Sequence, residues 1–151
     1  MSRLEPASLT IRQPVAEDAP RLASLSSELG YPATGAEITA RLARLLGRAD
    51  HCLRVAESPS GEAIAWIHAH EQAILESAPW CEIAGLVVDP AHRGEGAGRA
   101  LVTAVEAWAR ERGLAVVKVR SNVVRQESHP FYQRLGFDRI KTQHVYRKPL
   151  R

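Results

Sequence analysis

The chain has 151 residues, of which 45% are hydrophobic and 25% charged, with a formal net charge of +3. This composition is typical of a folded globular domain and excludes a disordered or membrane-spanning chain, and the length suits one domain, residues 1–151. The basic residues are mostly arginines scattered along the chain, which argues against a nucleic-acid-binding protein and suits an anionic small ligand. There is no membrane-length apolar run and no signal peptide, so we expect a cytoplasmic protein.

The cysteines and histidines exclude two further classes of protein. Cys52 and Cys81 each lie in an apolar run, which predicts two buried free thiols rather than a disulfide framework. The six histidines show no spacing with cysteines or carboxylates that is typical of zinc ligands. We therefore expect no metal site.

The first half of the chain predicts two helices and a hairpin. The segments are a short strand at 9–12, a helix from about 16 to 29, a helix from 34 to about 46, and strands at 51–57 and 62 to about 71. Thr34 and Glu37 form a capping box that begins the second helix. Because only the turn at 58–61 separates the two longer strands, they are predicted to pair antiparallel.

The second half predicts a crossover unit. Its segments are a strand at 81–88, a helix at 98–112, a strand at 115–120, a helix at 130–135, and last strands at 137–140 and 142–148. A strand, a helix and a strand in this order imply a parallel pair. The expected fold class is therefore an α/β fold, a mixed sheet with helices on both faces.

A glycine-rich loop follows the strand at 81–88. It reads Asp89-Pro-Ala-His-Arg93-Gly-Glu-Gly96-Ala-Gly98-Arg99 and leads into a helix. The first amides of a helix have no partner inside it and carry the positive end of its dipole, so this loop predicts a phosphate-binding site. A P-loop needs Lys-Ser/Thr after its last glycine, and a dinucleotide fingerprint needs a glycine where Arg99 stands. Both nucleotide motifs are thereby excluded.

The pattern Arg93-x-x-Gly96-x-Gly98 after a strand resembles the pyrophosphate loop of the GCN5-related N-acetyltransferases, the GNAT family. A second block, Ser121-Asn122 followed by Phe131-Tyr132 and Gly136-Phe137, resembles that family's asparagine and its F-Y-x-x-x-G-F helix end. Together the similarities run from about Arg54 to the C-terminus. The resemblance implies a six- to seven-stranded sheet whose parallel fourth and fifth strands splay apart around the cofactor.

The resemblance implies acetyl-CoA as the donor and no metal. The strand would pair with the pantetheine arm, and the loop amides would hold the pyrophosphate. The residues implied in cofactor binding are Leu86, Val87, Val88, Arg93, Gly94, Gly96, Ala97, Gly98, Arg99, Asn122, His129 and Tyr132. His129 has an equally good alternative role, which is to cap the helix before Pro130.

Catalytic roles are also implied. The Val88 amide would polarise the thioester carbonyl, and the Tyr132 phenol would protonate the leaving thiolate. Glu82, an acid within an apolar strand, is the first candidate for the general base, with His70 and Glu71 as rivals. Simple alternation places Glu82 on the same face as Leu86 and Val88, but a bulge, frequent here in the family, would reset it.

The acceptor is the least determined part. Tyr31, His68 and His70 are candidates to line its pocket, and Trp80 lies just before the strand. We expect direct acetyl transfer to a primary amine of a small molecule. The alternatives are a protein or peptide acceptor, or a non-catalytic acyl-CoA-binding module. The resemblance also implies a homodimer as a possible assembly.

Overall fold

The computed structural model describes residues 8–120 and 128–150. Asn122 and Arg125 therefore lie outside the described residues. Contacts divide the chain into two compact units, Met1–Val119 and Arg120–Arg151, which are taken in turn. The expectation of a single domain stays a prediction.

The first unit is built on one mixed sheet. Its strands are β1 (Thr10–Arg12), β2 (His51–Glu57), β3 (Ala63–Ile74), β4 (Ser77–Val88) and β5 (Val117–Val119), in that spatial order. The first three pairings are antiparallel, and β4 pairs parallel with β5. The mixed sheet, the hairpin and the crossover are confirmed. β4 begins at Ser77, earlier than predicted, because β3 and β4 continue together as a long ribbon that accommodates Pro79 at its exposed end.

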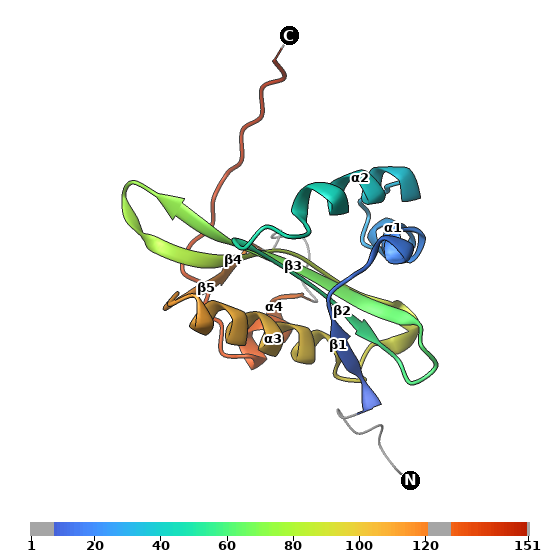
Figure 1. Cartoon of the computed structure of the whole chain (residues 1–151). Helices are drawn as coiled ribbons and strands as arrows, with labels where there is room; N and C mark the ends of the chain where they lie inside the picture. Colours follow the sequence, from blue (N-terminus) through green and yellow to red (C-terminus); the bar gives the residue numbers. More distant parts are fainter. Residues whose placement is uncertain (1–7, 121–127, 151) are drawn as a thin grey trace. The chain divides into compact units, whose positions relative to one another are not determined.

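Helices cover both faces of this sheet (Figure 1). On one face lie the 3-10 turn η2 (Ala16–Asp18) and helices α1 (Ala19–Glu28) and α2 (Gly35–Leu45). On the other lies α3 (Ala97–Glu111), preceded by the 3-10 turn η3 (Pro90–His92). The capping box is confirmed: the Glu37 amide donates to Thr34 Oγ1 at 3.1 Å, and the Thr34 amide to Glu37 Oε1 at 2.9 Å.

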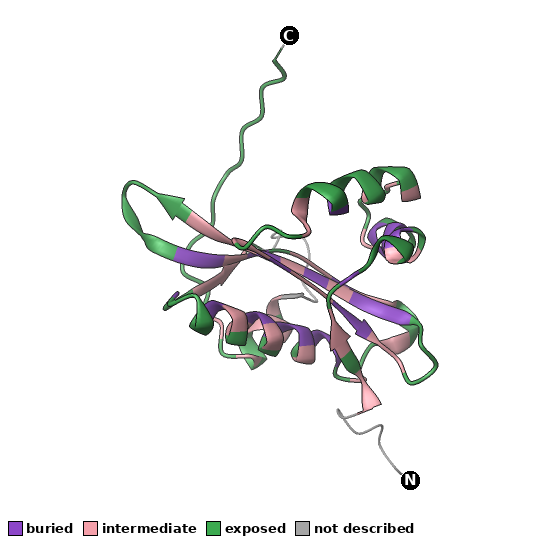
Figure 2. Cartoon of the chain, viewed as in Figure 1, coloured by how far each residue is buried: buried purple, intermediate pink, exposed green. Residues whose placement is uncertain are grey.

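The buried residues lie along the middle of the sheet and on the inward sides of the helices (Figure 2). Beneath α1 and α2 a core cluster joins Ala19, Leu22, Leu42 and Val55, with Trp66 packed against it. α3 buries Leu101, Val102, Val105 and Ala109, as its apolar spacing predicts. Cys52 and Cys81 are buried free thiols, also as predicted.

The second unit contains α4 (Ser128–Arg134) and the segment 135–150. The strands predicted at 137–140 and 142–148 are wrong, and the described residues form five strands rather than six or seven. Alternation indicates an extended backbone, but a strand also needs a neighbour for its N–H and C=O groups. Here the large apolar side chains of the segment 140–150 are exposed, with Val145 87% and Tyr146 91% accessible.

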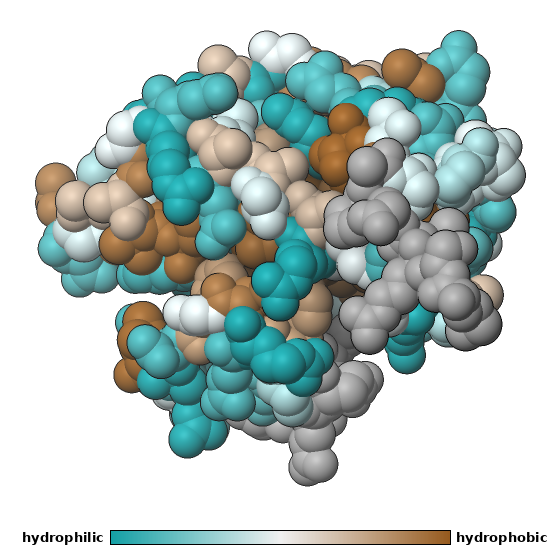
Figure 3. All heavy atoms as spheres, turned by 90° about the horizontal axis from the view of Figure 1, so that it is seen from below, coloured by the Kyte–Doolittle hydropathy of each residue, from teal (hydrophilic) through white to brown (hydrophobic). Residues whose placement is uncertain are grey.

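On the face seen in Figure 3, hydrophilic residues are interspersed with groups of apolar residues. Leu75, at the turn between β3 and β4, is fully exposed. None of the helices in the described ranges is long and apolar enough to cross a membrane.

A close contact between Trp66 and Gly85 fixes how β3 and β4 pack. A Cβ added to Gly85 would lie 3.0 Å from Trp66 Cη2 and Cζ3, and Trp66 is held by the α1–α2 core. We predict that Gly85→Ala lowers the free energy of unfolding by about 1 to 3 kcal/mol, because the ring has to move. Denaturant unfolding measures this change.

Gly35→Ala is the matched control. A Cβ there would meet only Pro20 Cα, at an ordinary 3.9 Å, inside a helix that favours alanine. We expect this variant to be as stable as the parent or slightly more stable. Equal stability of the two variants would show that the Trp66 contact is not tight.

Candidate active site

The glycine-rich loop joins β4 to α3 by a backbone path that requires glycine. Asp89 caps η3, where its Oδ1 accepts from the Ala91 amide at 2.9 Å. The chain then turns through Gly94 with φ +83° and Gly96 with φ +88°. Positive φ values of this kind are strained for other residues, so both glycines are explained by conformation.

The loop ends at the first backbone amides of α3. The Ala100 amide donates to the Gly96 carbonyl at 3.0 Å, so the helix's own hydrogen-bond ladder begins there. The amides of Ala97, Gly98 and Arg99 precede that ladder, at the positive end of the helix dipole. These amides can donate hydrogen bonds to the oxygens of a phosphate group.

The charged side chains of the loop are arranged in two ways. Arg93 and Arg99 are exposed, which leaves their guanidinium groups accessible to an anionic ligand. Glu95, the acidic residue of the loop, lies 3.1 Å from Nδ1 of His92. When His92 is protonated, the repulsion of an anion by Glu95 is reduced.

Arg21 of α1 ties the loop to the rest of the unit. Its Nη2 donates to Asp89 Oδ2 at 2.5 Å, and its Nε donates to the Ala63 carbonyl at 2.8 Å. The amide of Ala91 and the Arg21 guanidinium together hold the pKa of Asp89 below its ordinary value of 3.8. The charge on Asp89 is therefore retained, and with it the cap that begins the loop.

β4 is paired on one side only as it approaches the loop. β5 pairs with Cys81, Glu82 and Ile83, and in the described part of the chain this ladder ends there. β3 continues to pair with β4 as far as Val88. The segment 84–88, which contains Leu86, Val87 and Val88, thus offers a backbone edge to an extended ligand, as the expected splay of the two strands requires.

A bulge in β4 sets the direction of Glu82. Ile83 pairs with Ala69 but Gly85 pairs with His68, so Ala84 is the extra residue. Because paired residues share a face of the sheet, Glu82 lies on the face of His70, opposite Leu86 and Val88. Simple alternation is therefore wrong at Glu82, and the bulge that would reset it is confirmed.

Three histidines gather on the face that bears α1 and α2. Nδ1 of His51 lies 2.8 Å from Nε2 of His68, a hydrogen bond between two rings. The ring of His51 stacks on His68 at 5.1 Å and on His70 at 5.3 Å, measured between centroids. Within residues 8–120 and 128–150 no group of three or more His, Cys, Asp or Glu side chains is arranged to hold a metal ion.

The environment keeps His68 neutral. Burial, with the neighbouring rings of His51 and His70, lowers the pKa of His68 to about 4. Burial also lowers the pKa of His51, against the opposing charge of Asp50. At neutral pH the His51–His68 contact is therefore a hydrogen bond between uncharged imidazoles, one as donor and the other as acceptor.

Glu82 continues this polar face towards β5. The Trp80 indole N–H lies 3.4 Å from Glu82 Oε1, a long hydrogen bond, and Lys118 Nζ lies 4.0 Å from the Trp80 ring centroid. Lys118 is the residue paired with Glu82 across the parallel ladder. Glu82, Trp80 and Lys118 thus form one contiguous group beside His70.

The rival base Glu71 lies elsewhere. It pairs with Cys81, on the opposite face from His70 and Glu82, and its carboxylate accepts two hydrogen bonds from Arg112 of the α3 end at 2.9 and 3.0 Å. Glu71 is thereby held in an ion pair with the helix. Of the three candidates for the general base, Glu82 and His70 therefore lie on the same face of the sheet, as paired residues of β3 and β4.

The remaining candidates lie on other elements of the chain. Tyr31 lies between α1 and α2 and is 61% exposed. In the second unit, Tyr132 on α4 makes edge-to-face contacts with Phe131 and Phe137, at 5.1 and 5.7 Å between centroids. His129 lies on the same helix.

Arg21, His51 and Lys118 were missed by sequence reasoning. Arg21 carries no motif, and only its hydrogen bonds to Asp89 and Ala63 show its role. The sequence did contain a signal for His51, because His51 and His68 lie in strands predicted to pair. The register shift between Ala56 and Glu57 nevertheless prevents the exact partner from being deduced. For Lys118 the signal was its place in the strand parallel to that of Glu82.

Comparison with known proteins settles the family. The model of the acetyltransferase (GNAT) family matches residues 21–137. The chain belongs to the GNAT family. The GNAT match includes the loop after β4 and extends into the second unit, so the resemblance stated from the motifs is confirmed.

Curated relatives show that this GNAT protein is an N-acetyltransferase. It is 30% identical over 145 residues to an aminoglycoside N(6')-acetyltransferase type 1 of Stenotrophomonas maltophilia, covering 93% of this chain and 94% of the relative. It is also 37% identical over 79 residues to an aminoalkylphosphonate N-acetyltransferase of Salmonella typhimurium, covering 52% of this chain and 51% of the relative.

Solved structures show the same fold. The aminoglycoside 6'-N-acetyltransferase AAC(6')-Ih of Acinetobacter baumannii superposes with a TM-score of 0.83 at 20% identity, covering 94% of this chain and 99% of the other. AAC(6')-Iy, solved in complex with CoA, has a TM-score of 0.83 at 22% identity, covering 94% and 95%. The mixed sheet with a parallel β4–β5 pair is thus the GNAT fold.

The bond between Arg21 and Asp89 leads to a stability prediction. We expect Arg21→Met to lower the free energy of unfolding by about 1 to 3 kcal/mol at neutral pH, because Asp89 loses a charged donor. A lowered carboxyl pKa stabilises the fold above the unfolded value of 3.8, and this contribution is lost as pH falls through the folded value. The difference between parent and variant is therefore expected to shrink below about pH 4.

Arg41→Met is the control for this variant, since Arg41 forms an exposed i,i+4 pair with Glu37 at 4.0 Å. Its expected effect is below about 0.5 kcal/mol. Unfolding curves from pH 3 to pH 8 compare the three proteins. A loss for Arg21→Met that is the same at all pH values would contradict the assignment to the Asp89 charge.

Proposed function

We propose that this N-acetyltransferase transfers an acetyl group from acetyl-CoA directly to a primary amine of a small molecule. The single observation that carries this proposal is the arrangement at the end of β4. In the described residues the last part of this strand is paired on one side only, and the glycine-rich loop then leads to the first amides of α3, which have no side-chain cap. An extended arm that ends in a pyrophosphate matches both features. The match of the family across both units supports treating residues 1–151 as one domain.

In this proposal the donor lies along β4. Leu86, Val87 and Val88 pair with the pantetheine arm, and the Val88 amide donates to the oxygen that becomes negative in the transition state. The pyrophosphate accepts hydrogen bonds from backbone amides of the loop. The residues proposed to supply them are Arg93, Gly94, Gly96, Ala97, Gly98 and Arg99. Asn122, which lies outside the described residues, and His129 are proposed to hold the arm.

The acceptor is proposed to bind on the face of α1 and α2. The opposite face beneath α3 buries apolar residues, whereas this one presents His68, His70 and Glu82. Glu82 is our first candidate for the base that deprotonates the amine, directly or through water, with His70 as its rival. Tyr31, in the loop between α1 and α2, is proposed to line the same pocket.

Transfer is proposed to be direct because the thiols are unsuited to act as nucleophiles. Burial raises the pKa of Cys52, and it raises the pKa of Cys81 to about 12. A thiolate, the reactive form, is therefore not available at neutral pH. Two reduced, buried cysteines also fit the proposed cytoplasmic location.

An acceptor panel tests the function. Purified protein is incubated with acetyl-CoA and either neamine, 2-aminoethylphosphonate, spermidine or a lysine-containing peptide, and the released CoA thiol is measured with the mass of each product. We expect release with at least one of the small amines and a product heavier by one acetyl group. Release with the peptide alone would favour the protein-acceptor alternative, and binding without release would favour a non-catalytic module.

The proposed general acid gives a sharper prediction. Tyr132→Phe is expected to lower kcat by roughly 10- to 100-fold, because the leaving thiolate loses its proton donor, while the KM for acetyl-CoA stays within about twofold. Steady-state kinetics with the best acceptor of the panel measure both constants.

Tyr146→Phe is the matched control, because Tyr146 is 91% exposed in the segment after α4. We expect the control to behave as the parent. If Tyr132→Phe has the same kcat as the parent, Tyr132 is not the acid. If kcat and affinity for acetyl-CoA fall together, the phenol binds the donor instead.

A further inference from the structure

The hydrogen bond between His51 and His68 is not explained by binding of the donor. It joins β2 to β3 on the face proposed for the acceptor, where Leu53 pairs with His68 and His51 with His70. His68 in turn pairs with Gly85, beside the bulge at which the donor edge of β4 begins. The two rings therefore extend outward across the sheet from Gly85, in the strand that is proposed to hold the donor.

Amide formation from an ammonium group requires a route for one proton. A primary ammonium carries three protons on nitrogen, of which one stays on the amide and one goes to the sulfur of CoA. The third leaves as H⁺ in every turnover. A half-buried site needs groups that pass this proton to solvent, since a charge stored inside it is costly.

We propose that His68 and His51 form the proton exit path of the acceptor site, with His68 as the inner and His51 as the outer relay. This inference rests on the proposed function, because it needs an acceptor amine on this face. It assigns His51, which acts through His68, to the reaction, and it adds a proton-carrying role to His68.

The relay balances without any further reactant. Since Nε2 of His68 and Nδ1 of His51 face each other at 2.8 Å, the outer nitrogens are Nδ1 of His68 and Nε2 of His51. The proton that the base has taken from the ammonium is passed to the first of these, the central proton moves from Nε2 of His68 to Nδ1 of His51, and a proton leaves Nε2 of His51. The opposite tautomer shift through solvent then restores both rings.

The surroundings of the two rings favour passing a proton from His68 to His51 over keeping it on His68. Because burial lowers the pKa of His68 to about 4, an imidazolium there is short-lived, and the proton is passed on as it arrives. At His51 the carboxylate of Asp50 opposes the lowering of its pKa by burial, His70 and Arg48. A proton is thus better tolerated at the outer ring than at the inner one.

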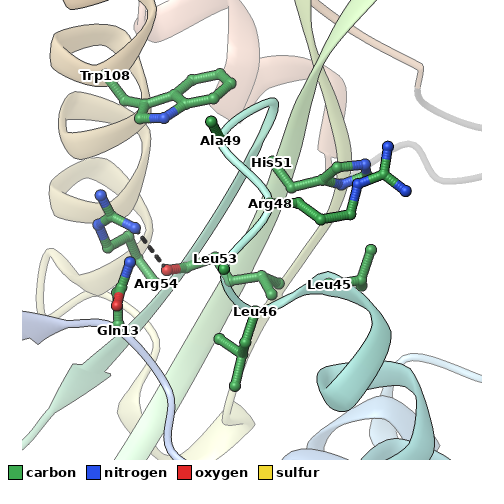
Figure 4. A pocket seen from close by; sticks show the side chains of 10 residues that line it. Gln13, Leu45, Leu46, Arg48, Ala49, His51, Leu53, Arg54 and Trp108 are labelled. Carbon is green, nitrogen blue, oxygen red and sulfur yellow. Dashed lines mark hydrogen bonds between the residues drawn. The ribbon is translucent and has the colours of Figure 1, made fainter.

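The outer ring opens onto a pocket. His51 lines a cavity of about 300 Å³ together with Arg48, Leu53, Arg54 and Trp108 (Figure 4). The cavity lies between the end of α2, the start of β2 and one turn of α3. This pocket is the proposed exit of the proton to solvent, on β2 rather than on β4, along which the donor is proposed to lie.

The test is the pH dependence of His51→Gln. Glutamine can keep a hydrogen bond to His68 but cannot relay a proton. We expect kcat with the best acceptor of the panel to fall about tenfold near pH 7, where the amine arrives as an ammonium. The loss is expected to disappear as the pH approaches the amine's own pKa, because the amine then arrives deprotonated.

His144→Gln is the matched control, since His144 is exposed in the segment after α4. We expect it to follow the parent at every pH. A loss in His51→Gln that is equal at all pH values, or no loss, overturns the relay while leaving the proposed function standing. Absence of turnover by the parent with every amine overturns the proposed function and the relay with it.

A second measurement does not depend on the acceptor. Nitrogen-15 NMR of the histidine rings in the parent protein reports which nitrogen carries each proton. We expect the Nε2–H tautomer for His68 and an unprotonated Nδ1 in His51, with His68 neutral down to about pH 5. The reverse tautomers, with the proton on Nδ1 of His51 and not on Nε2 of His68, would contradict the resting state that the relay requires.

Discussion

The bulge at Ala84 is the constraint on which the candidate site depends. One extra residue in β4 coincides with the end of its pairing to β5, and it turns Glu82 to the face opposite Leu86 and Val88. Without it, the acid would point beneath α3 into the apolar core, where a carboxylate is unfavourable. The bulge thus lies where the β4 edge proposed for the donor begins, and it directs Glu82 to the face proposed for the acceptor.

Much of this fold was predictable from local patterns. The capping box at Thr34, the hairpin at 58–61, the glycine loop and the apolar spacing of α3 each depend on residues close in sequence. That the described segment after Gly136 forms no strand was not predictable, because alternation shows that a segment can be extended and not whether it pairs. A strand forms only where a neighbouring strand pairs with it, and the alternation of one segment does not show whether such a neighbour exists.

The site divides in the same way. The loop proposed for the donor was predictable as a conformation because its glycines leave a motif, as Gly94 and Gly96 do through their positive φ. The acceptor side was not, since it depends on register: the shift between Ala56 and Glu57 decides that His51 meets His70, and the bulge decides that Glu82 does. Register shifts of one residue exchange the two faces of a strand and leave little trace in a single sequence.

The separation of the two faces of the sheet also affects how such a protein can diversify. The face beneath α3 packs against the apolar side of that helix, whereas the opposite face carries His68, His70 and Glu82, with Tyr31 in the loop between α1 and α2. If the acceptor binds as proposed, substitutions on the second face alter the shape and charge of its pocket and leave the proposed donor loop unchanged. One scaffold could then acquire new amine substrates by such changes, with the proposed donor contacts along β4 retained.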